Sequence, residues 1–319
     1  MPNTLQSSAQ DQAAEVWPAL PLDAWRATYE TLHMWMQIVG KVRLGLTPLV
    51  NHWWNVPLYV TSRGLTTSAM PCGDRDVEIA FDFIEHDLVI TSSDGHRAAL
   101  PLVPRTVADF YGELMQSLAD LGVQVRIWPV PVEVSNPIPF PEDRQHASYD
   151  PEYASRFWKI LLQTSQIFHE FRGRFIGKCS PVHFFWGSFD LAVTRYSGRR
   201  APPRPGADRI MREAYSHECI SHGFWPGGAW FGKEVPGPIF YSYTAPGPAG
   251  LREEPIRPPT ARFDPELSEF ILRYDDVRAA PSPRQAVWEF MQSTYEAGAN
   301  RASWNRAELE RSDSRVPVK

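Results

Sequence analysis

Residues 177–195 read GKCSPVHFFWGSFDLAVTR: a glycine–lysine pair, then a histidine with two aromatic residues, then an alternating run that ends in arginine. Residues 40–63, GKVRLGLTPLVNHWWNVPLYVTSR, carry these features in the same order. A second pair of similar strings follows, ELMQS beginning at Glu113 and EFMQS beginning at Glu289. Diverged internal copies predict a pseudo-twofold architecture, and the junction of two halves is a natural place for a pocket.

Hydrophobic periodicity, capping residues and turn signals divide each half into a helix, several antiparallel strands and a second helix. The first helix is expected to end at Gly40, and Thr106 and Asp150 are expected to cap later helices. This order predicts an α+β fold of two diverged repeats, because the chain lacks the βαβ alternation and glycine-rich motif of a dinucleotide fold. The predicted helices cover residues 23–39, 106–121, 150–173 and 283–299, and the predicted strands cover 53–61, 77–83, 88–91, 97–102, 124–128, 183–195, 215–225 and 270–274.

The proline-rich stretch 129–149 lies near the middle of the chain and is expected to be a semi-rigid connector between the halves. A second stretch rich in proline and glycine, near 236–259, has no counterpart in the first half, so we interpret it as an insertion with a short edge strand around Tyr241 and Tyr243. The predicted organisation is a disordered N-terminus (1–16), a first half (17–128), the connector (129–149), a second half with its insertion (150–304) and a disordered tail (305–319).

The composition, 43% hydrophobic and 22% charged residues among 319, is that of a soluble globular protein. A net charge of −5 gives no electrostatic indication of nucleic-acid binding. No run approaches the roughly 18 apolar residues that span a bilayer, so no membrane partner is expected. The three cysteines, Cys72, Cys179 and Cys219, are too few and too irregularly spaced for a disulfide framework, which favours a cytoplasmic location.

The two histidine-headed runs supply the candidate binding site. If both are regular strands, His183 shares a face with Phe185 and Arg195, and Trp186 and Asp190 lie on the opposite face. The histidines and lysines of the two halves would then face each other across the pseudo-axis and suit a small polar or anionic ligand. The alternative for each histidine is a hydrogen-bonded side chain that closes a core layer. The predicted ligand-binding residues are Lys41, His52, Trp54, Arg63, Lys178, Trp186 and Arg195.

The cluster formed by His217, Glu218 and His222 is the most enzyme-like sequence in the chain. On a strand, adjacent residues point to opposite faces, so His217 and Glu218 cannot form one dyad, and the histidine spacing does not suit a zinc site. A general base with a carboxylate to orient it would need residues from two strands. The catalytic candidates are His217 and His183, with Glu218 and Asp190 as carboxylates; no metal is predicted and no cofactor is indicated.

Several longer strings point to a known family. They include NHWWNVPLYVT from Asn51, GKCSPVHFFWGSFD from Gly177 and YSHE from Tyr215. Together they resemble a bacterial family known as a domain of unknown function (family 5996), and the resemblance extends from about Trp17 to Trp304. It implies a stand-alone bacterial protein and supplies no reaction, substrate or catalytic residue.

Two hypotheses of function follow from the sequence. The first is a small-molecule-binding protein whose aromatic, lysine- and histidine-lined pocket lies between the halves, with acid–base or hydrolytic chemistry as its enzymatic form. The second is a structural or protein-interaction module, in which the proline-rich insertion and the tryptophans form the contact surface. The burial of the lysine–histidine pairs discriminates between them; the sequence does not specify the oligomeric state.

Overall fold

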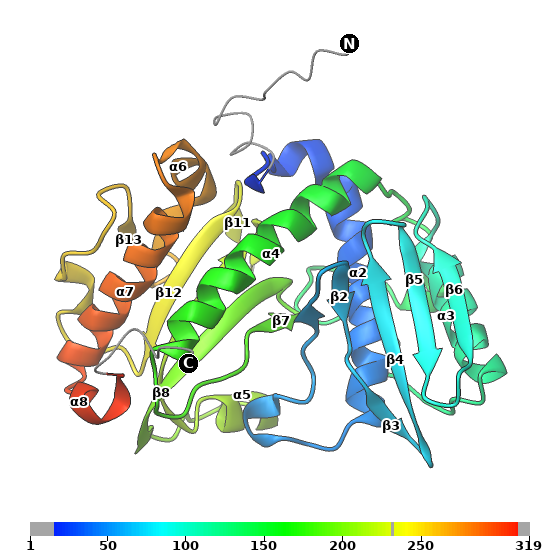
Figure 1. Cartoon of the computed structure of the whole chain (residues 1–319), viewed down its shortest axis with the longest axis horizontal. Coiled ribbons are helices and arrows are strands. Elements are labelled where there is room, and N and C mark those ends of the chain that lie inside the picture. The colour runs from blue at the N-terminus through cyan, green and yellow to red at the C-terminus, as the bar shows by residue number, and fades with distance from the viewer. Residues whose placement is uncertain (1–15, 231–232, 312–319) are drawn as a thin grey trace, which may run out of the picture.

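The computed structural model describes residues 16–230 and 233–311, and within these it contains two antiparallel sheets of six strands each (Figure 1). Helices combined with antiparallel sheets confirm the α+β class. The first sheet has the spatial order β1 (Tyr59–Val60), β2 (Gly64–Thr66), β4 (Arg75–Asp82), β5 (Asp87–Ser92) and β6 (Arg97–Pro101), with β3 (Met70–Cys72) also paired to β4. The second has the order β7 (His183–Phe185), β8 (Asp190–Arg200), β9 (His217–Trp225), β12 (Ile239–Ala245), β14 (Glu269–Arg273) and β13 (Arg262–Asp264).

The two sheets meet at one residue pair. The backbone N–H of Leu58 donates to the carbonyl oxygen of Phe184 at 2.9 Å, and the N–H of Phe184 donates back to Leu58 at 2.8 Å. Leu58 immediately precedes β1 and Phe184 lies in β7, so the first strand of each sheet is also the strand at the junction. The pseudo-twofold relation between the halves stays a prediction.

Long helices cover opposite faces of the two sheets. In Figure 1, α2 and α3 lie behind the first sheet, whereas α4 and α7 lie in front of the second. None of the helices in the described part of the chain is both long and apolar enough to cross a membrane. The helices are α2 (Leu22–Leu46), α3 (Val107–Asp120), α4 (Pro151–Gly173), α5 (Arg209–Ala214), α6 (Tyr274–Ala279), α7 (Pro283–Arg301) and α8 (Arg306–Leu309). The 3-10 turns are η1 (Asn51–Trp53), η2 (Phe140–Glu142) and η3 (Leu251–Glu253). A small separate hairpin pairs β10 (Gly228–Trp230) with β11 (Lys233–Val235).

Aromatic side chains fill the core where the two halves meet. The ring of Phe157 on α4 lies 5.3 Å from Trp25 of α2, 6.1 Å from Phe184 and 5.1 Å from Phe189, measured between ring centroids. All four side chains are buried. Large aromatic surfaces removed from water are a main source of folding free energy, so the junction is part of the hydrophobic core.

The helix caps predicted at Thr106 and Asp150 are confirmed. The Thr106 hydroxyl accepts a hydrogen bond from the N–H of Asp109 at the start of α3. The Asp150 carboxylate accepts from the N–H groups of Glu152 and Tyr153 at the start of α4. These side chains satisfy donors that the first turn of a helix leaves free, which is why local sequence predicts helix starts well.

The predicted end of the first helix at Gly40 is wrong, because α2 continues to Leu46. Gly40 lies inside the helix for a packing reason. A Cβ atom at this position would lie only 2.2 Å from the indole ring of Trp186, which is itself buried. Only a glycine lets this ring approach the helix backbone so closely, so the residue marks a contact and not a helix end.

Two long predicted strands are also wrong. Residues 53–61 form part of η1, a turn and the two-residue β1. Residues 183–195 form β7 and β8, joined by a turn at 186–189 in which Phe189 has a positive φ of 63°.

The turn reverses the predicted faces. His183 pairs with Ala192 and Phe185 with Asp190, so these side chains share one face and Arg195 lies on the other.

Other differences concern strand position and the chain end. Residues 124–128 form no strand, and Tyr241 and Tyr243 lie in β12, an interior strand between β9 and β14, where an edge strand was predicted. The tail predicted to be disordered includes α8, and the carbonyl oxygen of Leu309 accepts the N–H of Ile176 at 2.8 Å. The predicted disorder at 1–15 and 312–319 falls outside the described residues.

Candidate functional site

The side chains of Lys178 and His52 form the centre of the candidate site. The ammonium nitrogen of Lys178 lies 2.6 Å from Nε2 of His52. Nδ1 of His52 lies 3.1 Å from the carbonyl oxygen of Ala214, which can only accept, so Nδ1 carries the proton. Nε2 is therefore the acceptor, and Lys178 donates to a neutral imidazole.

Aromatic rings form the walls around this pair. The Lys178 ammonium lies 5.4 Å from the ring centroid of Trp54 and 5.2 Å from that of Tyr196. The His52 ring packs against both, at 5.4 Å from Trp54 and 4.7 Å from Tyr196. Cation–π attraction and the hydrogen bond together hold the flexible lysine in one position.

An unusual backbone places His52 here. His52 and Trp53 adopt left-handed conformations, with φ of 57° and 61°. The N–H of His52 donates to the carboxylate of Glu213 on α5 at 3.2 Å, and Asp208 caps that helix. A segment of the first half is thereby fixed against strands β8 and β9 of the second half, and strain of this kind is often found at functional sites.

His217 completes the cluster. Its ring centroid lies 5.7 Å from that of His52, and its Nδ1 lies 3.0 Å from the hydroxyl of Ser216. Burial lowers the pKa of both histidines, and the charge of Lys178 lowers them further. Burial also lowers the pKa of Lys178. Both imidazoles are therefore neutral at pH 7, and the positive charge of the cluster resides on Lys178.

No carboxylate in the described part of the chain forms an ion pair with Lys178, although the residue is exposed. Arg200 lies opposite His217 in the register of β8 and β9, and it too forms no ion pair with a described carboxylate. The carboxylate next to His217 in sequence, that of Glu218, lies on the other face of β9 and binds Arg199 at 2.6 Å. The Glu213 carboxylate accepts the backbone N–H of His52, and no described carboxylate forms an ion pair with the Lys178 ammonium.

The other predicted histidine and lysine have different surroundings. His183 is fully buried with its ring 6.1 Å from Trp54, so the predicted His52/His183 pair is separated by that tryptophan. Burial, and then Arg43 and Arg172, lower the pKa of His183 to about 3. Among the residues that the structure describes, neither of its ring nitrogens has a hydrogen-bond partner.

The Lys41 ammonium lies 5.7 Å from the ring centroid of Trp186. Within the described residues it forms no hydrogen bond with Lys178 or His52. Trp186 in turn donates to the carbonyl oxygen of Val56 at 2.8 Å. Lys41 and Trp186 therefore belong to the Gly40 packing contact and lie apart from the Lys178 cluster.

Glu218 and Asp190, the two carboxylates considered for catalysis, occupy separate places. Glu218 accepts from Ser197 at 3.0 Å and from Arg199, on the face of β9 opposite His217, as the alternation predicted. Asp190 is buried and accepts hydrogen bonds from Ser188 and Tyr241. Of the four catalytic candidates, His217 alone is a member of the Lys178 cluster.

Asp190 has acidic neighbours that sequence reasoning missed. Burial, followed by the charge of Asp190, raises the pKa of Glu133 to about 7 and that of Glu269 to about 8. These residues come from the connector and from β14, so no local pattern links them to Asp190. No three histidine, cysteine, aspartate or glutamate side chains of the described residues are arranged to hold a metal ion.

Two predicted ligand-binding arginines have structural contacts. The guanidinium carbon of Arg195 lies 3.3 Å from the ring centroid of Phe171 and 4.4 Å from that of Tyr295, and burial lowers its pKa to about 10. Arg195 is 1% exposed, so it cannot reach a ligand in solution.

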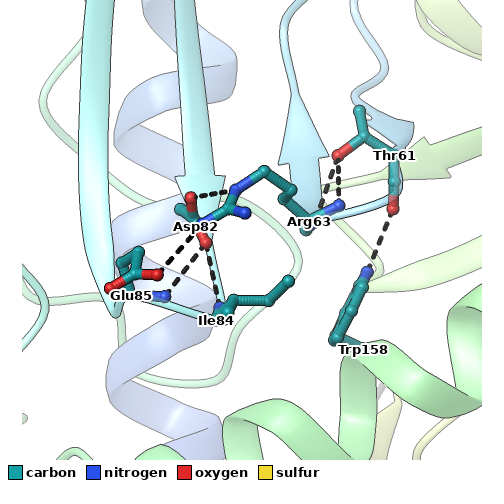
Figure 2. Close-up of polar contacts among 7 residues, drawn as sticks. Thr61, Arg63, Asp82, Ile84, Glu85 and Trp158 are labelled. Atoms are coloured by element: carbon teal, nitrogen blue, oxygen red, sulfur yellow. Dashed lines mark hydrogen bonds and ion pairs between the residues drawn. The ribbon is translucent and has the colours of Figure 1, made fainter.

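Figure 2 shows that Arg63 lies in a second structural network, where its Nε donates to Asp82 at 2.6 Å. Trp158 of α4 donates to the carbonyl oxygen of Thr61, in the same turn, at 3.1 Å.

Within this network Asp82 is expected to matter more than Arg63. The Asp82 carboxylate also accepts from the N–H groups of Ile84 and Glu85, at 2.9 and 3.1 Å, so Asp82→Ala leaves three donors without their acceptor. We expect a loss of about 2 kcal/mol in the free energy of unfolding. Arg63→Met removes only a half-exposed ion pair, which solvent screens, and should cost less than Asp82→Ala. Urea unfolding measures both; equal losses would contradict this ranking.

Comparison with known proteins gave one match. The model of a family described as "Family of unknown function (DUF5996)" matches residues 17–311. No curated protein and no solved structure gave a significant match.

Proposed function

Because the chain belongs to this family of unknown function, which assigns it no activity, we propose a function from the site itself: the protein binds a small anionic ligand at Lys178, His52 and His217. The observation that supports this most is the ammonium of Lys178, which is exposed, held in position and without a carboxylate partner among the described residues. An anion would supply the missing counter-charge. Charge-assisted hydrogen bonds are the stronger kind in proteins, so such a ligand gains from a lysine that is already oriented.

The neutral histidines suit the same ligand. Nε2 of His52 is occupied by Lys178, which leaves the other N–H groups of that ammonium for an acceptor. His217 adds a second ring beside them. A site with one fixed positive charge and polar neighbours favours a carboxylate or phosphate group over an uncharged ligand.

The location of the cluster agrees with a ligand site between two halves of the chain. We propose that these halves arose by duplication and later diverged. His52 and Trp54 come from the first half, and Lys178, Tyr196 and His217 come from the second. Each half contains a path of five strands paired in chain order, β1-β2-β4-β5-β6 and β7-β8-β9-β12-β14, between two long helices in the sequence, which supports a duplication; β3 and β13 lie outside this shared order. A cytoplasmic location with no nucleic-acid or membrane partner is part of the same proposal.

Lys178→Met is expected to weaken the binding of inorganic phosphate by about tenfold to a hundredfold, because a charged hydrogen bond contributes about 1.5–3 kcal/mol. Isothermal titration calorimetry at constant ionic strength measures the change, with acetate as a second anion. Lys159→Met is the matched control, since Lys159 is an exposed lysine on α4 and should leave binding unchanged. Wild-type protein that binds neither anion, or a K178M variant that binds like wild type, would refute the proposal.

A further inference from the structure

A surface cavity of about 400 Å³ opens close to the first residue of β9. It is lined by Tyr215, Ala245 and Pro246 and by the segment 201–205, which reads Ala-Pro-Pro-Arg-Pro. A volume of this size is in the range of small-molecule sites, which are mostly apolar with a few polar groups. Here the one charged lining group is the guanidinium of Arg204.

The cavity and the Lys178 cluster are both lined by members of one hydrophobic cluster. Tyr196, Cys219 and Ala245 form a buried hydrophobic cluster, and Trp54, Tyr215 and Tyr243 pack against it. Trp54 and Tyr196 are walls of the Lys178 cluster, whereas Tyr215 and Ala245 line the cavity. The chain also connects them directly, because Tyr215 is two residues before His217 in sequence.

The cavity lining is held in place by specific contacts. The hydroxyl groups of Tyr215 and Tyr243 lie 2.9 Å apart, and the guanidinium carbon of Arg204 lies 3.8 Å from the centroid of the Tyr215 ring. The N–H of Ala201 donates to the carbonyl oxygen of Ser216 at 3.0 Å. Three prolines restrict the remaining backbone of the segment, so the cavity is organised without a ligand.

We infer, on the basis of the proposed anion site, that this cavity is a subsite for an aromatic ring, and that the ligand class is an aryl phosphate or aryl carboxylate. The anionic group would lie at Lys178 and the ring against Tyr215, Arg204 and the prolines. Planar rings pack well on tyrosine and proline faces, and a guanidinium stacks on an aromatic face. Arg204 has no ion pair with any described carboxylate, so its charge also favours an anion nearby.

The test compares two phosphate monoesters of equal charge, phenyl phosphate and methyl phosphate, by isothermal titration calorimetry. We expect phenyl phosphate to bind at least about tenfold more tightly, since burying a ring contributes more than the roughly 1.4 kcal/mol that this factor requires. Ala201→Leu, which narrows the cavity, should remove the preference and leave methyl phosphate binding unchanged. Arg204→Met should reduce the preference because it removes the guanidinium from the cavity lining, and K178M should weaken the binding of both esters.

The outcomes separate the subsite from the anion site. Equal affinity of the wild-type protein for the two esters would overturn the aromatic subsite and leave the anion site standing. Binding of neither ester would overturn both. A preference for phenyl phosphate that survives in both A201L and R204M, each shown to be folded by its melting temperature, would overturn the location of the subsite.

Discussion

Gly40→Ala is expected to destabilise the protein by about 3 kcal/mol, at the upper end of what overpacking a core costs. The new methyl group would lie 2.2–2.4 Å from three atoms of the Trp186 indole. The ring cannot move away freely, because it is buried and its N–H donates to the carbonyl oxygen of Val56. Accommodation therefore requires α2 or the turn at 186–189 to shift.

The control for this variant is Gly112→Ala. Gly112 is an exposed residue inside α3, and a Cβ there would meet nothing within 4 Å. The same substitution should stabilise the protein by about 0.5–1 kcal/mol, because alanine is the better helix former. Chemical denaturation of the two variants measures the sign of each change. If both stabilise the protein, the Gly40–Trp186 contact is not as close as described.

His183→Phe is expected to make the protein more resistant to acid. Burial lowers the pKa of His183 in the folded protein to about 3, from the ordinary histidine value of 6.5. As the pH falls below 6.5, the unfolded chain binds a proton that the folded protein does not, so stability is lost progressively down to about pH 3. Phenylalanine removes this loss, and the variant should retain about 2 kcal/mol more of its pH 7 stability at pH 5 than the wild type does.

The comparison between two pH values is necessary because other groups act in the opposite direction. The pKa values of Glu133 and Glu269 are raised, so the folded protein takes up protons before the unfolded chain does, and stability increases as the pH falls through 8 and 7. These contributions are common to wild type and variant and cancel in the difference. Parallel stability curves for wild type and H183F would contradict the prediction.

Local signals predicted the elements that depend on local chemistry. The caps at Thr106 and Asp150, and the alternating runs that became β4 and β5, need no distant partner. The prediction of a helix end at Gly40 was wrong because its contact partner, Trp186, lies far away in sequence, and helix propensity carries no information about such a contact. The prediction of one continuous strand over 183–195 was wrong because the chain turns at Phe189, whose positive φ is rare for a large side chain.

Only some residues of the candidate site could be proposed from local sequence. Its charged and titrating residues, Lys178, His52 and His217, stand out in sequence by their chemistry. Tyr196 and Arg204 were missed, since their role depends on which strand face and which loop are adjacent in space. The burial of Arg195 could not be predicted, because an arginine buried among aromatic rings has the same sequence signature as an exposed one.

The backbone bridge between Leu58 and Phe184 has a consequence for association. A strand at the edge of a sheet presents unpaired N–H and C=O groups that can recruit a strand from another molecule. Here the backbone hydrogen bonds between Leu58 and Phe184 pair part of the edge at β1 with part of the edge at β7, so these groups cannot pair with another molecule. Separating the halves would expose both edges at once. The junction therefore covers part of both edges, and a half-length fragment is expected to self-associate more strongly than the intact chain.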